Sequence, residues 1–442
     1  MLNLISILLL LFAFFFGYTK PRSAIWFVAF TYPLLYPVNF PIIPSDSLYL
    51  NITRLSLVII LGVHLRKGKY FQISKILKSS FIKAYLLFAI YLFVVSIGDM
   101  TQYYIFSFMP EVYISIALGY FLIEKEKDYK KLIGVLTWQA LVFGIIIFLE
   151  FFGIVNIFLL ISQNVPNFDM NNINEDFSRA GIKRVYGMDG NAINSAVRLV
   201  ILVPIAFLHT KLNKTKRSYV FIIIIFFSII ILMSRAAYIS LLLSTFFIIF
   251  QMAKLKKNFL TKILYAFKIF FSISTILILL FTFSPFFNNI FISLYSFSFE
   301  SSTIDNLSQR TSMIPFVLEL FINNFFIGQF KSPLYIYKEI MGGHDLALPL
   351  IYVISGGFTL LILFFNWWIR MPFYFIRKDI FKNKTNEFKL LLILVSASFV
   401  GGIIPMLSNW VDTSVSLMLI IFCSTFKYNI IKKQSFISNN SK

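Results

Sequence analysis

Long apolar runs broken by short basic segments constrain the fold of this chain more than any other feature. Residues 219–233, 239–252 and 263–283 are runs that approach or reach the roughly 20 residues that a helix needs to span a bilayer. Of the 442 residues, 58% are hydrophobic and only 13% are charged, against about 25% charged in soluble domains. The alternating pattern of a membrane β-barrel is absent. The sequence therefore predicts an all-α polytopic membrane protein.

We expect about 12–14 transmembrane helices in a single integral membrane domain, residues 1–442. The thirteen expected spans are 2–18, 24–43, 52–65, 84–98, 109–123, 132–153, 192–209, 218–233, 236–252, 263–283, 346–366, 390–408 and 413–427. The first run lacks a basic leader and a small-residue cleavage site, so we expect it to remain as a span rather than be removed as a signal peptide. Only Ser234 and Arg235 separate the eighth and ninth spans, which predicts a tight hairpin.

The distribution of Lys and Arg predicts the orientation of these spans, because basic residues gather in the cytoplasmic loops of membrane proteins. One set of connections, together with Lys268, holds 31 of the 40 Lys and Arg residues, whereas 14 of the 19 Asp and Glu residues lie on the other side. The basic set comprises 19–23, 66–83, 124–131, 210–217, 253–262, 367–389 and the tail from 427. We therefore place this set and the C-terminus in the cytoplasm, and the N-terminus outside.

Several function classes are excluded or lack support. The net charge of +21 is spread over loops and forms no soluble basic domain, so we expect no nucleic-acid partner. Cys423 is the only cysteine, which excludes an intramolecular disulfide and a cysteine-based metal site. The chain has no phosphate-binding P-loop, no Asp-x-Asp pair and no His-Glu-x-x-His motif. We therefore expect no cofactor, no metal and no nucleotide.

Two outer loops are long, at 154–191 and 284–345. Loops of this length in a compact protein are usually functional or disordered, and their cations and aromatic residues favour function. Glu111 and Glu150 lie near span ends, where they fit interfacial residues as well as the acidic groups of a coupled transporter.

The segment 178–191 ends the first long loop and enters the seventh span. Its cations are Arg179, Lys183 and Arg184. Gly187 and Gly190 permit tight turns, and Asn191 is a good cap for the helix that follows. A helix N-terminus beside basic groups is a ready anion site. The alternative is a basic cluster that contacts only lipid headgroups.

Two further segments carry outer cations. Arg235, between two apolar spans, is a candidate functional residue because a charge near the bilayer centre costs about 2.5 kcal/mol or more. The alternative is that it simply reaches the outer headgroups. In the second long loop, Arg310 precedes a helix-like stretch, and Gly342-Gly343-His344-Asp345 precedes the next span. His344 can act as a base near neutral pH, although a single loop histidine is more often incidental.

Taken in order, these segments resemble the superfamily of O-antigen polymerases and O-antigen ligases. The residues that carry the resemblance are Arg184, Gly187, Asn191, Ser234, Arg235, Arg310, Ile327, Gly328, His344, Gly356 and Gly357. They cover roughly 178–360, whereas the N-terminal third matches only as apolar spans. Ala236 stands where the family usually has Gly, and Asp345 where it has Asn, which leaves the subfamily open.

The resemblance implies a glycosyltransferase of the bacterial inner membrane with a periplasmic active site and periplasmic long loops. A polymerase moves the growing chain from undecaprenyl diphosphate onto a new lipid-linked repeat unit, with membrane lipid, a flippase and a chain-length regulator as partners. Arg184, Arg235 and Arg310 would bind the diphosphate, Arg179 and Lys183 would assist, and His344 would be the base. Arg binds phosphate bidentately, which suits a diphosphate leaving group.

Two alternatives stay open. An O-antigen ligase would transfer the glycan to lipid A core. A polysaccharide flippase or transporter belongs to a different class, and we would expect internal repeats and cations inside its bundle. The sequence shows neither feature, and it does not indicate the sugar, the linkage or the oligomeric state.

Overall fold

The computed structural model describes most of the helical part of the chain. The described residues are 4–32, 39–41, 49–67, 79–99, 101, 104–156, 178–179, 182–183, 185, 187, 192–213, 217–232, 234–255, 315, 318–336, 348–377, 380, 384–407 and 413–440. Every structural statement below concerns these residues.

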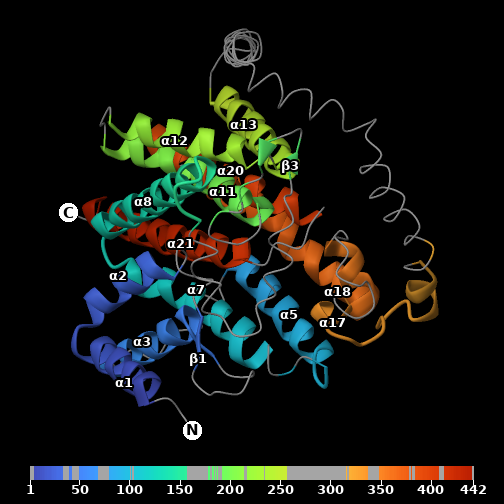
Figure 1. The fold of residues 1–442 in the computed structure, drawn as a ribbon. Coiled ribbons are helices and arrows are strands. Elements are labelled where there is room, and N and C mark those ends of the chain that lie inside the picture. The colour runs from blue at the N-terminus through green and yellow to red at the C-terminus, as the bar shows by residue number, and fades with distance from the viewer. Residues whose placement is uncertain are drawn as a thin grey trace.

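The described chain is helical apart from two very short β ladders (Figure 1). The α-helices are α1 (Leu4–Thr19), α2 (Pro21–Thr31), α3 (Ile52–Lys67), α5 (Ser80–Val95), α7 (Met109–Leu122), α8 (Glu126–Phe151), α11 (Ala192–Asn213), α12 (Arg217–Ile231), α13 (Arg235–Lys254), α17 (Pro333–Tyr335), α18 (Leu348–Phe373), α20 (Asn386–Ile403) and α21 (Thr413–Asn440). A π-helical turn, Tyr104–Phe108, precedes α7, and a 3-10 turn, Ile404–Leu407, follows α20. The antiparallel ladders pair β1 (Asn39–Pro41) with β2 (Tyr49–Asn51), and β3 (Ser178–Arg179) with β4 (Ile182–Lys183).

Six of the described helices are long and apolar enough to cross a membrane: α8, α11, α13, α18, α20 and α21. Four shorter apolar helices, within α1, α5, α7 and α12, accompany them. Large apolar side chains remain exposed along several of these helices, among them Phe12, Leu87, Phe246 and Ile362. Soluble proteins rarely expose such extended apolar surface, whereas lipid covers it. The protein is therefore a polytopic helical membrane protein, as the apolar runs predict.

Most of the expected spans coincide with helices, and one prediction is wrong. In the described part of the span expected at 24–43, α2 ends at Thr31 and the strand β1 lies at Asn39–Pro41. Pro33, Pro37 and Pro41 explain the difference, because proline lacks a backbone N–H and disfavours helix in the residue before it. The span expected at 263–283 lies outside the described residues. The total of 12–14 helices therefore remains a prediction.

Helix α11 is the centre of one part of the bundle, where it packs against α8, α12, α13 and α20. Small residues allow α11 and α20 to approach closely, since a Cβ on Gly401 would lie 2.8 Å from a Val200 side-chain carbon. The hydroxyl of Ser398 donates a hydrogen bond to the backbone oxygen of Ile201. The hydroxyl of Ser244 on α13 donates to the backbone oxygen of Ala397 at 2.8 Å. Side-chain hydroxyls and glycine contacts thus hold α11, α13 and α20 together.

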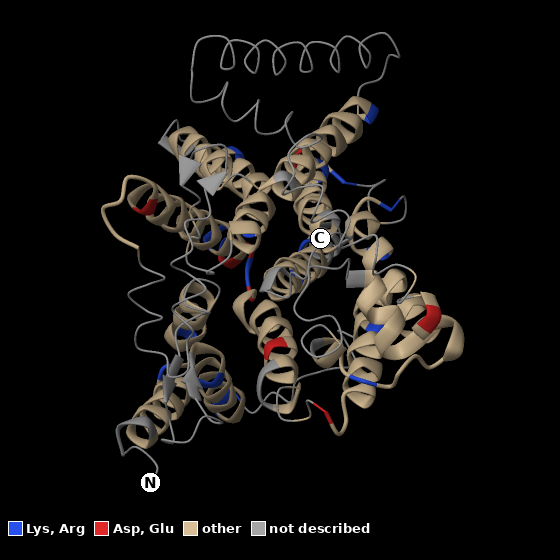
Figure 2. Ribbon diagram, turned by 45° about the vertical axis from the view of Figure 1, so that its right-hand side comes forward, with Lys and Arg blue, Asp and Glu red and all other residues tan. Residues whose placement is uncertain are grey.

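An ion-pair cluster joins four segments that we assign to the cytoplasm. Arg22 pairs with Asp128 at 2.6 Å, and Lys67 pairs with Glu124 at 2.6 Å. Lys432 near the C-terminus pairs with Glu126 at 3.4 Å. Figure 2 shows that the described helices carry few Lys, Arg, Asp and Glu residues along their length. The four segments lie at the same end of the bundle, as the charge distribution predicts.

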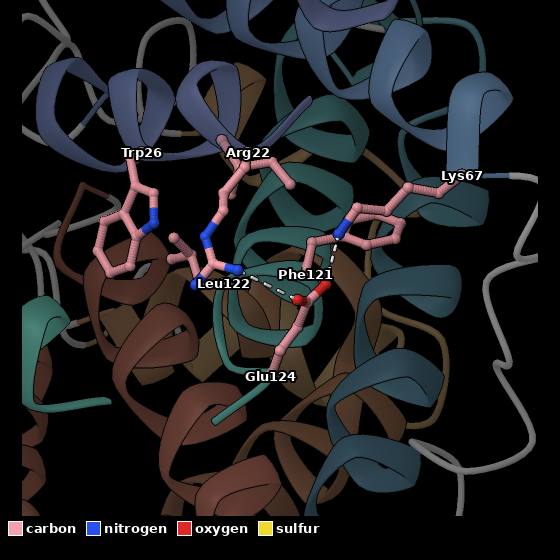
Figure 3. Close-up of a pocket in the computed structure, with 7 residues that line it drawn as sticks. Arg22, Trp26, Lys67, Phe121, Leu122 and Glu124 are labelled. Atoms are coloured by element: carbon pink, nitrogen blue, oxygen red, sulfur yellow. Dashed lines mark hydrogen bonds and ion pairs between the residues drawn. The ribbon is translucent and has the colours of Figure 1, made fainter. Parts of the chain in front are cut away.

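A small hollow lies within this cluster, lined in part by Arg22, Trp26, Lys67, Phe121 and Glu124 (Figure 3). The hydrogen bond from Lys67 lowers the pKa of the Glu124 carboxyl, so this group stays ionised near neutral pH. Asp128 is buried and accepts hydrogen bonds from the backbone N–H groups of Glu124 and Lys125, which caps the start of α8. The pairing therefore fixes the start of α8, the end that we assign to the cytoplasm.

The orientation can be tested with introduced cysteines, because the single native cysteine, Cys423, is buried. In a Cys423→Ala background we expect Lys127→Cys to react with a membrane-impermeant maleimide only after right-side-out vesicles are permeabilised. Phe152→Cys, at the other end of α8, should react in sealed vesicles. The 26 residues of α8 extend about 39 Å at 1.5 Å per residue, which is enough to separate the two positions by a bilayer. Labelling of both positions from one side would contradict the assignment.

Candidate functional site

The structure describes only part of the predicted site. Arg184, Arg310 and His344 lie outside the described residues. For Arg179, Lys183 and Arg235 the backbone is described but the side chain is not. The expected grouping of these six residues is therefore untested. Around each predicted segment, however, the structure describes neighbouring residues and their contacts.

Arg179 and Lys183 belong to the hairpin formed by β3 and β4. Ser178 pairs with Lys183, and Arg179 pairs with Ile182. The two cations therefore come from adjacent strands of one short ladder in the first long loop. The all-α prediction misses this ladder, because two-residue strands leave no periodic signal in a sequence.

Gly187 is fixed by a buried carboxylate, that of Glu150 at the outer end of α8. The backbone N–H of Gly187 donates to Oε2 of Glu150 at 2.9 Å, and Nδ2 of Asn156 lies 3.4 Å from Oε1. Gly187 has φ +68°, which confirms the tight turn predicted there. A Cβ at this position would lie 2.6 Å from Oγ of Ser195 in the first turn of α11. The end of the loop is therefore seated between α8 and α11.

Sequence reasoning missed this role of Glu150. The residue ends a long apolar stretch of α8 and is only 7% exposed. The available signal was its position, since a carboxylate at the end of an otherwise apolar helix must find a hydrogen-bonding partner when it is buried. Its partner lies 37 residues away in the chain, so the pairing itself could not be read from local sequence.

Arg235 is the first residue of α13. Ser234 caps this helix, with its buried hydroxyl accepting from the N–H of Ala237 at 3.4 Å. The hydroxyl of Tyr238 donates to the backbone oxygen of Ile230 at 2.6 Å, which ties α13 to the end of α12. This geometry confirms the tight hairpin. It also places the Arg235 backbone at a helix N-terminus, where free N–H groups favour anions.

The starts of α11 and α13 lie at the same end of the bundle. Trp138 and Gly144 of α8 contact Phe221 and Ser228 of α12, so α8 and α12 run in the same direction. Helix α13, which follows α12, therefore begins at the end of the bundle where Gly187 contacts Ile147 of α8 and Ser195 of α11. Gly187 contacts the first turn of α11, and Arg235 begins α13. The described ends of the first and second predicted segments therefore share one end of the bundle.

Helix α18 is interrupted at the glycine pair. Gly356 has φ −126° and ψ 18°, and Gly357 has φ 64° and ψ −160°. A turn at 324–329 docks against this break and supplies hydrogen bonds. The N–H of Gln329 donates to the Ile354 oxygen at 2.7 Å, the N–H of Phe358 donates to the Phe325 oxygen at 2.8 Å, and the hydroxyl of Thr359 donates to the Phe326 oxygen at 3.0 Å. The backbone groups freed by the break thus bond to protein.

Glycine is required on both sides of this contact. A Cβ on Gly328 would lie 2.5 Å from the Gly357 nitrogen, and a Cβ on Gly357 would lie 2.5 Å from the carbonyl carbon of Phe326. The pairs Ile327-Gly328 and Gly356-Gly357, which are separate motifs in the sequence, therefore form one backbone contact. Sequence reasoning identified both pairs but did not predict that they meet.

Lys331 anchors the chain that leaves this turn. It pairs with Asp99 at 2.9 Å, and this hydrogen bond raises the pKa of Lys331. Its backbone oxygen accepts from the hydroxyl of Ser355 at 2.5 Å. Lys331 and Asp99 are both assigned to the outer side, and their contact agrees with that assignment.

Arg198 is a basic residue on α11, one turn beyond Ser195 and thus close to the end of the first long loop. It is 5% exposed, and its guanidinium lies 5.2 Å from the ring centre of Phe143 on α8. A charged residue buried within a membrane helix is a candidate functional residue. Among the described residues, no three His, Cys, Asp or Glu side chains group as metal ligands. The hollow at Arg22 and Glu124 lies at the opposite end and includes none of the predicted site residues.

No protein-family model matches the chain, and no characterised protein matches it significantly in sequence. The candidate site is therefore argued from its own residues.

The glycine contact can be tested by a matched pair of substitutions. We expect Gly357→Ala to lower the unfolding temperature in detergent clearly more than Gly153→Ala. Both positions have positive φ, which strains alanine at each, and Gly357, with φ 64° and ψ −160°, lies in a region that is essentially restricted to glycine. Only the Gly357 side chain would meet neighbouring backbone, whereas nothing lies within 4 Å of a Cβ at Gly153. Equal shifts in the two variants would contradict the close contact.

Proposed function

We propose that the protein is a surface polysaccharide polymerase, a membrane glycosyltransferase that joins undecaprenyl diphosphate-linked oligosaccharide units on the periplasmic face of the bacterial inner membrane. The support comes from the ordered segments of the sequence that resemble O-antigen polymerases, and from the placement of the described segments among them. O-antigen or another surface polymer fits the proposal equally.

The observation that carries the proposal is the position of Arg235. It begins α13 at the turn of the hairpin that α12 and α13 form, on the side to which we assign only nine of the 40 basic residues. The end of the first long loop reaches the same end of the bundle through Gly187. Guanidinium groups and free helix N–H groups together favour a phosphate ligand.

The proposed reaction depends mainly on stabilising the negative charge that develops on the leaving group. A hydroxyl of the acceptor sugar attacks the anomeric carbon of the donor, a new C–O bond forms, and the bond from that carbon to the diphosphate oxygen breaks. The proton of the hydroxyl passes to His344, and undecaprenyl diphosphate leaves with the bonding electrons. Arg184, Arg235 and Arg310 stabilise the charge that develops on the phosphate oxygens. Arg179 and Lys183 assist in binding.

Cleavage of the bond between the donor sugar and the diphosphate supplies the energy of this transfer, so neither ATP nor a nucleotide sugar is required at the outer face. The same scheme fits an O-antigen ligase, for which the acceptor is lipid A core. The donor and its leaving group are the same in the two cases, so the described residues do not distinguish them.

A transporter is the second candidate, and one observation favours it. The interruption of α18 at Gly356-Gly357 is of the kind that forms substrate sites in many transporters. The break is, however, filled by the turn at 324–329, whose backbone bonds to both sides of it. We therefore prefer the transferase.

The enzyme proposal can be tested by extending a purified lipid diphosphate-linked repeat unit in vitro. We expect Arg235→Ala to lower the turnover number by about 10²-fold or more, the usual effect of removing one group that stabilises developing charge. Lys254→Ala is the matched control, because Lys254 is a cation in the last turn of the same helix. Full activity of a folded Arg235→Ala protein would overturn the proposed role.

Loss of the gene distinguishes the polymerase from the ligase. Without a polymerase, surface glycan should carry a single repeat unit, because ligation continues without chain growth. Electrophoresis of the surface glycan would show one short band above the core. Bare core with accumulated lipid-linked polymer would instead indicate the ligase, and unflipped units on the cytoplasmic face would indicate a flippase.

A further inference from the structure

Glu150 bonds to both ends of the first long outer loop. Asn156, near the start of this loop, lies 3.4 Å from Oε1 of Glu150, and Gly187, near its end, donates to Oε2 at 2.9 Å. Glu150, Asn156 and Gly187 form what we call the Glu150 clamp. A single carboxylate thereby closes a loop that contains the predicted cations Arg179, Lys183 and Arg184.

Burial of this carboxylate is costly, so its contacts have a structural consequence. A buried ionised carboxylate loses its hydration, which costs several kcal/mol unless hydrogen bonds replace the water. Glu150 is 7% exposed, and both of its oxygens have a partner from the loop. The loop is therefore attached to α8 through both carboxyl oxygens of Glu150.

The end of the loop packs closely against the helices beneath it. Val185 is 2% exposed, and Gly187 packs against Ser195 and Ile147 with no room for a side chain. Both neighbours belong to long helices, α11 and α8, that pack against each other. Val185 and Gly187, one and three residues after Arg184 in the sequence, are therefore both held within the bundle.

We propose that Glu150 is a positioning residue: it fixes Gly187 against the start of α11 and thereby sets the position of the first loop, whose predicted cations bind the lipid diphosphate. Glu150 does not touch the substrate in this account. It acts through Gly187, which lies three residues after Arg184. The inference rests on the proposed function for the identity of the ligand, but the attachment of the loop is independent of it.

The proposed role predicts which kinetic constant changes, because the loop cations act when the lipid-linked donor binds. The loop cations contact the diphosphate before and during reaction, so their misplacement weakens binding more than turnover. We expect Glu150→Ala to raise the KM for the lipid-linked donor about tenfold and to change the turnover number about threefold or less. Glu150→Gln keeps an oxygen that accepts from Gly187, so its KM should lie close to that of the wild type.

Hydrogen–deuterium exchange provides a readout that does not depend on activity. In Glu150→Ala, exchange of the Gly187 amide should accelerate about tenfold or more, because its charge-assisted hydrogen bond is lost. Glu111→Ala is the matched control, since Glu111 is a second buried glutamate, 8% exposed, that accepts a hydrogen bond from Ser416 on α21. This control should leave Gly187 exchange and the KM unchanged.

The outcomes separate this inference from the proposed function. Unchanged Gly187 exchange in Glu150→Ala would overturn the clamp, even if the protein proves to be a polymerase. Faster exchange with an unchanged donor KM would overturn the positioning role. Faster exchange in a protein that shows no transferase activity with any lipid diphosphate-linked donor would leave the clamp intact and refute the proposed function.

Discussion

The structure depends on one constraint, that a backbone polar group facing lipid must find its hydrogen-bonding partner within the protein. Regular helices meet this requirement over most of the described chain. The described outer segments interrupt the helices in three places and meet it differently in each. The hydroxyl of Ser234 caps α13, the carboxylate of Glu150 binds the Gly187 amide, and the turn at 324–329 bonds to the break in α18. Each interruption coincides with a segment that the sequence marks by a cation or a glycine.

Charge is distributed to match this architecture. Ion pairs among Arg22, Lys67, Glu124 and Asp128 gather the cytoplasmic segments into one cluster. At the outer side the described cations are fewer, and Arg235 lies at a helix N-terminus. Such a residue lies neither in the loops where the charge bias gathers cations nor on the surface of a long loop. Its charge therefore needs another source of stabilisation. We propose that an anionic ligand supplies it, and a lipid diphosphate is the anion that the resemblance implies.

The sequence predicts much of the fold and less of the site. The expected spans coincide with helices because apolar length is a property of the chain itself, and the error at 24–43 arose from prolines that apolar composition hides. Gly187 and the hairpin before Arg235 were predictable because turn geometry is local. The contact between Gly328 and Gly357 and the bond from Gly187 to Glu150 were not, because they join residues distant in sequence. Arg184, Arg310 and His344 keep their roles as predictions.

The central claim is that the outer cations bind a diphosphate. Its most direct test is the affinity of the purified protein in lipid nanodiscs for undecaprenyl diphosphate compared with undecaprenol. Because the two lipids share the same chain, the difference isolates the headgroup. The account predicts that the diphosphate binds at least about tenfold more tightly, through charge-assisted hydrogen bonds, and that added salt reduces this preference. Equal affinity for the two lipids would contradict it.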